Sequence, residues 1–125
     1  MAESFWMIPD IANVRTPLGI LREQAAALTA LTKGTLVGIV EANRGGPQDM
    51  FIQLDVAVPA LNDYRHRILV YDQPVTMYPG LLWVGEGPRQ PIYDEQTFIS
   101  TVKDTLASER IRNVLATLLA QATQA

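Results

Sequence analysis

Residues 50–71, MFIQLDVAVPALNDYRHRILVY, constrain the fold more than any other part of the chain. Apolar and polar residues alternate on both sides of a turn-forming segment, as they do in half-buried antiparallel strands. The pattern predicts strands over residues 50–58 and 64–71, joined by residues 59–63, where Asn62 and Asp63 favour a tight turn. The predicted buried faces carry Met50, Ile52, Leu54, Val56 and Val58 in the first strand and Tyr64, His66, Ile68 and Val70 in the second.

Folding the chain at this turn also predicts a register for the hairpin. The buried face would pair Val58 with Tyr64, Val56 with His66, Leu54 with Ile68 and Ile52 with Val70, and the outer face Asp55 with Arg67 and Phe51 with Tyr71. Pairs of opposite charge and pairs of aromatic rings at facing positions stabilise a sheet. A slip of one residue would place apolar side chains opposite polar ones along both strands, so this register is the favoured one.

Three helices flank the predicted sheet. Thr16 and Pro17 form a helix start, and the helix would end near Gly34, with Lys33 in its last turn. Asp94 and Ser108 are N-cap residues for helices over 95–107 and 109–122. Further strands are expected over 35–43 and over 75–78 and 81–84, as one interrupted strand or two short ones, with a loop over 85–91. The chain is therefore predicted to be a single α+β domain, residues 1–125, with an N-terminal helix, an antiparallel sheet of three to five strands, and two C-terminal helices packed on one face.

Composition excludes several classes of site. The chain has no cysteine, so thiolate metal sites, iron–sulfur clusters and disulfides are absent. Its one histidine and its scattered carboxylates show no ligand spacing, and no metal or cofactor is expected. A net charge of −3 argues against nucleic acid as a partner, because phosphate binding needs clustered lysine and arginine.

The first fifteen residues are apolar but aperiodic. They contain neither a basic region nor a long apolar run, so no signal peptide is expected, and no segment approaches the length of a membrane span. We therefore expect a soluble, cytoplasmic protein that does not bind a membrane. Phe5, Trp6, Met7 and Ile8 are too hydrophobic for a free tail. Residues 1–15 are expected to form an arm or short strand that packs on the body of the domain or on a second copy of the chain.

No motif in the sequence names a reaction. The phosphate-binding patterns GxxxxGK[ST] and GxGxxG are absent, and no serine lies in GxSxG. His66 shares its predicted face with Ile68, which favours a structural role rather than a general base. The sequence therefore predicts a protein that is not an enzyme and has no catalytic residue.

Five residues are candidates for binding. Arg65 and Arg67 project side by side from one strand, either as a solvated, charge-paired surface with Asp55 or as a site for an anion or carboxylate. Tyr78, Trp83 and Tyr93 gather near the end of the predicted sheet, and tyrosine and tryptophan are favoured in interfaces as well as in ordinary packing.

Three segments resemble a family of small uncharacterised bacterial α+β proteins. They are TPLGILREQAAALTALTKG (residues 16–34), VAVPALNDYRHRIL (56–69) and IRNVLATLLAQA (111–122), and the resemblance covers most of the chain from residue 16 onward. It implies a bacterial origin and a single domain. It implies no activity and no functional residue, because these shared motifs are structural.

The leading hypothesis is a non-enzymatic protein–protein interaction module, with a homodimer as one form. A more specific form is a bacterial immunity, chaperone or secretion-associated accessory protein, by analogy of size and acidity. The alternative is a small-ligand-binding or enzyme domain, with a pocket between the curved sheet and the first helix near Tyr64, His66 and Trp83. A pocket would be detected by ligand-induced stabilisation, and a module by a partner or by concentration-dependent dimerisation.

Overall fold

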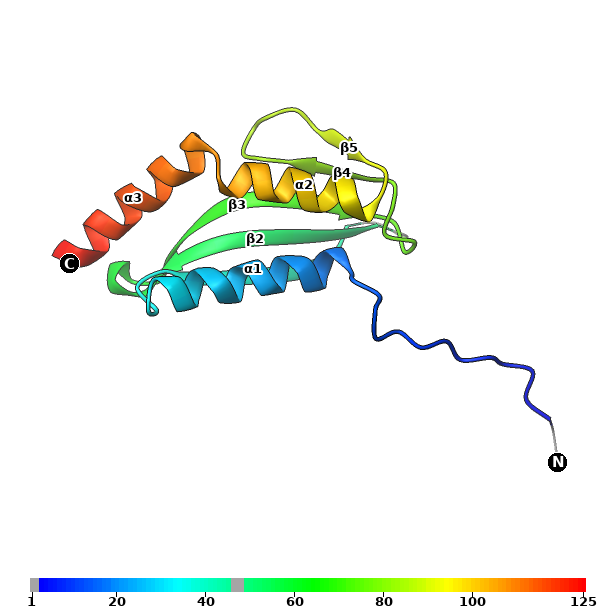
Figure 1. Ribbon diagram of the computed structural model, residues 1–125. Coiled ribbons are helices and arrows are strands. Elements are labelled where there is room, and N and C mark those ends of the chain that lie inside the picture. The colour runs from blue at the N-terminus through cyan, green and yellow to red at the C-terminus, as the bar shows by residue number, and fades with distance from the viewer. Residues whose placement is uncertain (1–2, 46–48) are drawn as a thin grey trace.

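The structure is a computed structural model that describes residues 3–45 and 49–125. One helix is followed by a five-stranded antiparallel meander in the order β1-β2-β3-β4-β5 and then by two helices (Figure 1). The elements are α1 (Pro17–Leu31), β1 (Val37–Arg44), β2 (Met50–Val58), a short 3-10 helix η1 (Pro59–Leu61), β3 (Tyr64–Gln73), β4 (Gly80–Trp83), β5 (Gln90–Ile92), α2 (Glu95–Leu106) and α3 (Glu109–Gln124). The predicted α+β class and order of elements are confirmed.

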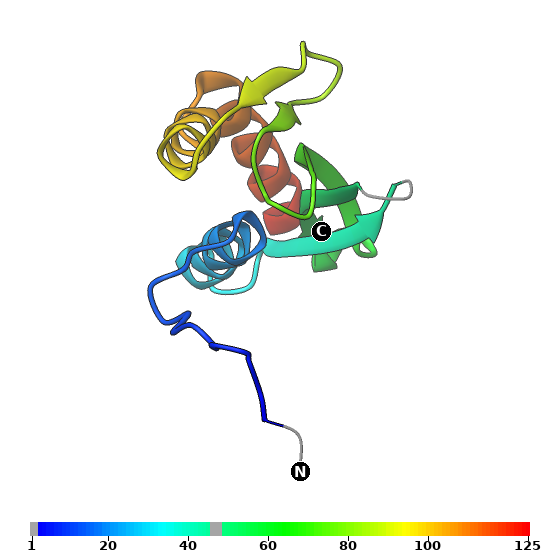
Figure 2. The same cartoon turned by 90° about the vertical axis from the view of Figure 1, so that its right-hand side faces the viewer.

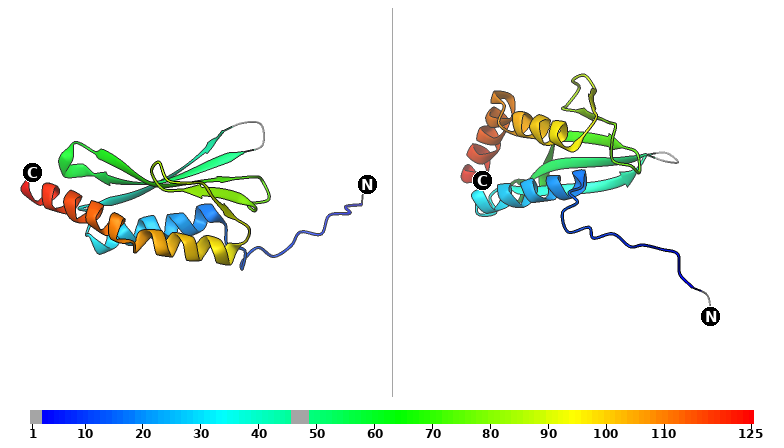
Figure 3. Two further views of the ribbon diagram at one scale, coloured as in Figure 1. Left: turned by 90° about the horizontal axis from the view of Figure 1, so that it is seen from above. Right: turned by 45° about the vertical axis from the view of Figure 1, so that its right-hand side comes forward.

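All three helices lie on one face of the sheet, so the molecule has two layers and the other face of the sheet carries no helix (Figure 3). The core lies between the layers. Its fully buried side chains include Leu21, Ile52, Tyr71 and Phe98. The spacing of apolar residues along the three helices predicts that Leu21, Leu28, Phe98, Val102, Leu115 and Leu118 face the core. Leu21, Phe98, Val102 and Leu118 are buried, and Leu28 and Leu115 are half-buried.

The helix starts follow the predicted capping chemistry. The side chains of Thr16, Asp94 and Ser108 accept hydrogen bonds from backbone N–H groups three residues later, at 2.9, 2.7 and 3.3 Å. α1 ends at Leu31, earlier than predicted, because Lys33 and Gly34 both have positive φ, and the Gly34 N–H donates to the Thr29 carbonyl.

The central hairpin follows the predicted register only near its turn. Val58 faces Tyr64, Val56 faces His66 and Asp55 faces Arg67, as expected. A β-bulge between Leu54 and Asp55 then shifts the pairing by one residue, so that the predicted pairs Leu54–Ile68, Ile52–Val70 and Phe51–Tyr71 are wrong. The observed pairs are Leu54–Leu69, Ile52–Tyr71 and Phe51–Asp72. The extra residue is Ile68 of β3, which has no partner in the register with β2. It lets Ile68 and Leu69 both enter the core, and it turns Val70 to the opposite face of the sheet.

Two predictions for the second half of the sheet are wrong. Residues 75–78 form a turn rather than a strand, because Met77 has a φ of 75° and its N–H donates to the Pro74 carbonyl. The loop predicted over 85–91 ends earlier, because residues 90–92 form β5 at the edge of the sheet. Pro91 made this segment resemble a loop, because proline has no N–H to donate to a neighbouring strand. It is tolerated here because β5 is an edge strand.

Candidate interaction surfaces

The N-terminal arm, residues 3–15, runs away from the body of the domain (Figures 1 and 2). Four consecutive apolar side chains on it are almost fully exposed: Phe5 is 90%, Trp6 84%, Met7 90% and Ile8 83% exposed. Packing of these side chains on their own domain, one of the two expectations, is therefore not what the structure shows. Packing on a second copy stays a prediction.

The root of the arm is held by polar contacts. Arg15 forms an ion pair with Glu23 of α1 at 2.9 Å, and within the arm itself the Asp10 carboxylate accepts the N–H of Ala12 at 2.9 Å. These contacts involve no apolar side chain of residues 5–8. The arm therefore starts from a defined place beside α1 and carries its apolar segment outward.

The first half of edge strand β1 is covered by α1. The Thr32 hydroxyl accepts the N–H of Leu36 at 3.1 Å and donates to the Leu36 carbonyl at 2.9 Å, and the Thr29 hydroxyl accepts the N–H of Gly38 at 3.0 Å. The two backbones approach so closely that a Cβ at Gly38 would overlap the backbone of Ala25. This role of Thr29 in α1 and of Thr32, the C-cap residue that follows α1, was not predictable from the sequence pattern.

On the helix-free face, Asp55 is held between two arginines. Its side chain is 8% exposed, with Arg65 at 4.0 Å and Arg67 at 3.6 Å. Arg65 also contacts Glu41 at 3.0 Å, and Arg67 donates to Gln53 at 2.9 Å. The arginines thus already have anionic or polar partners on their own sheet. This arrangement matches a charge-paired surface more closely than an open anion site.

The predicted aromatic group is divided between the two faces. Trp83 lies on the helix-free face, where it contacts the edge of Phe51 with ring centroids 6.3 Å apart and carries Arg89 over its ring at 4.4 Å. Tyr78 instead packs on the helix side against Phe98. Tyr93 is 70% exposed, just before α2. The five candidate binding residues therefore do not form one site: Arg65, Arg67 and Trp83 share a face, while Tyr78 and Tyr93 lie elsewhere.

Tyr71 and Tyr78 are the titratable groups most affected by the core. Burial, together with the smaller effects of the nearby Glu95 and Asp94, raises the pKa of Tyr78 from its ordinary value of 10.0 to about 12. Burial likewise raises the pKa of Tyr71. Both hydroxyls are therefore neutral at physiological pH, and their surroundings favour packing rather than proton transfer.

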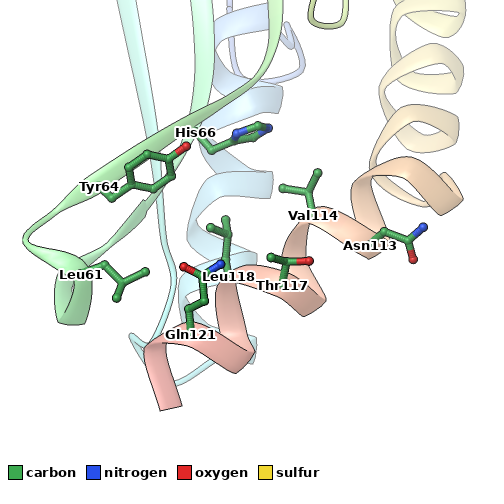
Figure 4. A pocket seen from close by; sticks show the side chains of 8 residues that line it. All are labelled: Leu61, Tyr64, His66, Asn113, Val114, Thr117, Leu118 and Gln121. Carbon is green, nitrogen blue, oxygen red and sulfur yellow. The ribbon is translucent and has the colours of Figure 1, made fainter. Parts of the chain in front are cut away.

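A pocket of about 580 Å³ lies between the start of β3 and α3 (Figure 4). Tyr64 and His66 of β3 face Asn113, Thr117 and Gln121 of α3 across it. Apolar walls come from Leu61, Val114 and Leu118. The expected pocket near Tyr64 and His66 thus exists, but α3 rather than α1 closes it, and Trp83 is on the opposite face of the sheet. The four-residue spacing of Asn113, Thr117 and Gln121 was the sequence signal for its polar wall.

A smaller apolar groove of about 200 Å³ separates α1 from α3. Leu28 and Leu31 of α1 and Leu115 of α3 form its sides, and Leu54, Val56 and Ile68 of the sheet form its floor. Leu31 is 83% exposed. The groove is comparable in size to a cavity that holds one aromatic ring.

Within residues 3–45 and 49–125, no three histidine or acidic side chains are grouped as metal ligands. In the same part of the chain, no helix has both the length and the apolar character needed to cross a membrane. Comparison of the sequence with protein-family models and curated proteins, and of the structure with solved structures, finds no match.

Proposed function

We propose that this protein is a non-enzymatic protein–protein interaction module that forms a homodimer through its N-terminal arm. The observation that supports the proposal is the near-complete exposure of Phe5, Trp6, Met7 and Ile8 on a segment that leads away from the domain. Contiguous exposed apolar surface is uncommon on monomers and usually marks an interaction site. Its size, acidity and α+β build support, by analogy alone, a small accessory role of the immunity, chaperone or secretion type.

A reciprocal exchange of arms gives enough contact area for a stable dimer. A buried aromatic side chain removes roughly 150–250 Å² from water, so the rings of Phe5 and Trp6 from two copies contribute about 600–1,000 Å². The surfaces that receive them bury a similar area. The total reaches the roughly 1,200–2,000 Å² of a standard specific interface. Each copy offers one arm and one receiving surface, so the exchange closes after two chains.

The proposal is tested by sedimentation of the full chain over a range of concentrations. The wild type should approach twice its monomer mass of 13.8 kDa at high micromolar concentration. The double variant Phe5→Ser/Trp6→Ser should dissociate at least tenfold more easily, a loss of about 1.4 kcal/mol or more. Val75→Ser is the matched control, because Val75 is also 90% exposed but lies outside the arm.

Circular dichroism should show that the double variant keeps the helix and sheet content of the wild type, since the replaced side chains make no contact with the core. A wild type that stays monomeric at all concentrations would refute the homodimer. So would a double variant that dimerises as tightly as the wild type.

The pocket beside α3 favours a second candidate, the binding of a small uncharged ligand. Its volume is within the roughly 300–1,000 Å³ usual for ligand sites. Its polar groups are hydroxyl, amide and imidazole, and none of its eight lining residues is Asp, Glu, Lys or Arg. Such a wall suits hydrogen bonds to a neutral polar ligand.

A thermal-shift screen of neutral polyols and amides would detect this ligand, because a ligand that binds only the folded state raises the melting temperature. Replacing Thr117 by Leu should remove the shift by filling the pocket. Replacing Thr123, an exposed α3 residue that does not line the pocket, by Leu is the control. A shift that survives Thr117→Leu would place the ligand elsewhere.

A further inference from the structure

The second half of β1 is an unpaired sheet edge. Backbone groups of alternate residues in a strand point to the same side. The N–H groups of Leu36 and Gly38 point to α1, where the threonine hydroxyls accept them. By the same alternation, the backbone groups of Val40, Ala42 and Arg44 point away from β2. The described part of the chain places no strand beside them, because β1 is the first strand in the sheet order.

The opposite edge is much less suited to pairing. β5 has only three residues, and its central residue, Pro91, has no N–H to donate. The uncovered half of β1 therefore offers the longer row of free donors and acceptors. An extended segment can add to such an edge as a further strand.

We infer that the arm of a second copy binds there, with residues 4–8 forming a strand along Val40–Arg44. This inference rests on the proposed homodimer and names the surface that receives the arm. Five consecutive arm residues precede Pro9, and each can donate an N–H. They match the length of the uncovered edge, from residue 40 to residue 44.

The position of the arm supports exchange between copies. α1 and β1 run in opposite directions through a short turn, so the start of α1 lies at the same end of the domain as Arg44 (Figure 1). The arm leaves from this end and leads away from its own sheet (Figure 2). Two copies placed edge to edge about a twofold axis would therefore have each arm start near the partner's free edge.

The side chains of the arm find an apolar neighbour on each face at the start of the free edge, whereas Glu41 and Asn43 make the rest of its helix-free face polar. In an extended segment, Phe5 and Met7 point to one side and Trp6 and Ile8 to the other. β1 offers half-buried Ile39 on the helix-free face. On the helix side it offers half-buried Val40. The groove between α1 and α3 has room for about one ring, so it would leave most of the arm uncovered.

The test uses a proline at the free edge. Ala42→Pro removes an N–H that makes no bond within the sheet, so the variant should fold while the incoming strand loses a donor. We expect its dimer to dissociate at least tenfold more easily than that of Ala42→Ser, which keeps the N–H. Sedimentation measures the dissociation, and circular dichroism checks the fold.

Comparison with the arm variant separates this inference from the proposed function. If Phe5→Ser/Trp6→Ser is monomeric while Ala42→Pro still dimerises, the arm module stands and the β1 site is overturned. If Ala42→Pro is monomeric while the arm variant dimerises, two β1 edges pair directly, and both the arm and its site are refuted. Loss of the dimer in both, with Ala42→Ser unaffected, supports the inference.

Amide hydrogen exchange on the wild type gives a second measurement that does not depend on the folding of the proline variant. The N–H groups of Val40 and Ala42 should exchange rapidly in dilute protein and become protected as the dimer forms. Those of Glu41 and Asn43, which point to β2, should be protected at every concentration. Protection of Val40 and Ala42 that does not change with concentration would mean that the arm folds back on its own chain, and would overturn a second copy as the occupant.

Discussion

Tyr71 and Tyr78 differ by one hydrogen bond, although both rings pack near Phe98. The Tyr71 hydroxyl donates to the Met77 carbonyl at 2.7 Å, whereas the buried Tyr78 hydroxyl has no partner among the described residues. Tyr71→Phe should therefore reduce the free energy of unfolding by about 0.5–1.5 kcal/mol. Tyr78→Phe removes an unpaired polar group, and should be neutral or raise the free energy by about 1 kcal/mol. Urea unfolding measures both. Equal losses in the two variants would contradict the difference in bonding.

The same tyrosines predict how stability depends on alkaline pH. The pKa of Tyr78 is raised in the folded state to about 12 from an ordinary value of 10.0, so the folded protein holds this proton more tightly than the unfolded chain does. Relative to its ionised form, the neutral Tyr78 side chain therefore stabilises the folded protein. This stabilisation is complete below pH 10 and is lost as the pH rises from 10 to about 12. Tyr71 acts in the same direction.

Unfolding measured across this alkaline range should show a falling midpoint, with a shallower fall in Tyr78→Phe. An identical slope in wild type and variant would show that Tyr78 is not the group responsible. The N–H of Thr97 lowers the pKa of Asp94, so this carboxylate stays ionised throughout the alkaline range and leaves the slope unchanged.

At the scale of the elements, the contact between α1 and β1 depends on Gly38. Replacing glycine by alanine inside a strand normally improves stability, since glycine loses more conformational freedom on folding. Here a Cβ would overlap the backbone of Ala25, so α1 would have to move away from the sheet. Gly38→Ala should therefore lower the free energy of unfolding by about 1–3 kcal/mol or more. A variant as stable as the wild type would show that the helix is held less tightly than this contact indicates.

The sequence predicted the elements better than their detailed pairing. Capping residues such as Thr16, Asp94 and Ser108 act locally, so helix starts could be predicted from sequence alone. Alternation fixed the hairpin near its turn, where polar Arg65 and Arg67 separate Tyr64, His66 and Ile68. It failed at the run of apolar residues from 68 to 71, because such a run fits either face and gives no sign of an extra residue.

At the scale of the whole molecule, the candidate surfaces depend on contacts between distant segments. The apolar composition of residues 5–8 predicts that these side chains need cover, but it predicts neither their exposure on their own chain nor the free half of β1. That edge is set by Thr29 and Thr32, which reach across from α1 and cover Leu36 and Gly38 alone. The nearness of Trp83 and Tyr78 in the sequence predicts one cluster, but the sheet places the two side chains on opposite faces.

The response of the dimer to salt distinguishes the arm from the charged, helix-free face as the contact surface. Phe5, Trp6, Met7 and Ile8 carry no charge, whereas Arg65, Arg67 and Asp55 form the polar centre of that face. Salt screens exposed charges over about 10 Å at 0.1 M and about 3 Å at 1 M. A dimer built through the arms should therefore keep its dissociation constant within about tenfold from low to molar salt. It should tighten slightly, because two chains of net charge −3 repel each other less.

Sedimentation equilibrium at several salt concentrations measures this response, and Phe5→Ser/Trp6→Ser in the same buffers gives the baseline without the apolar arm. Weakening by more than tenfold in molar salt would assign the contact to the arginine and carboxylate side chains of the sheet instead. Residues 5–8 would then need another partner, because association through the charged face leaves their apolar surface in water.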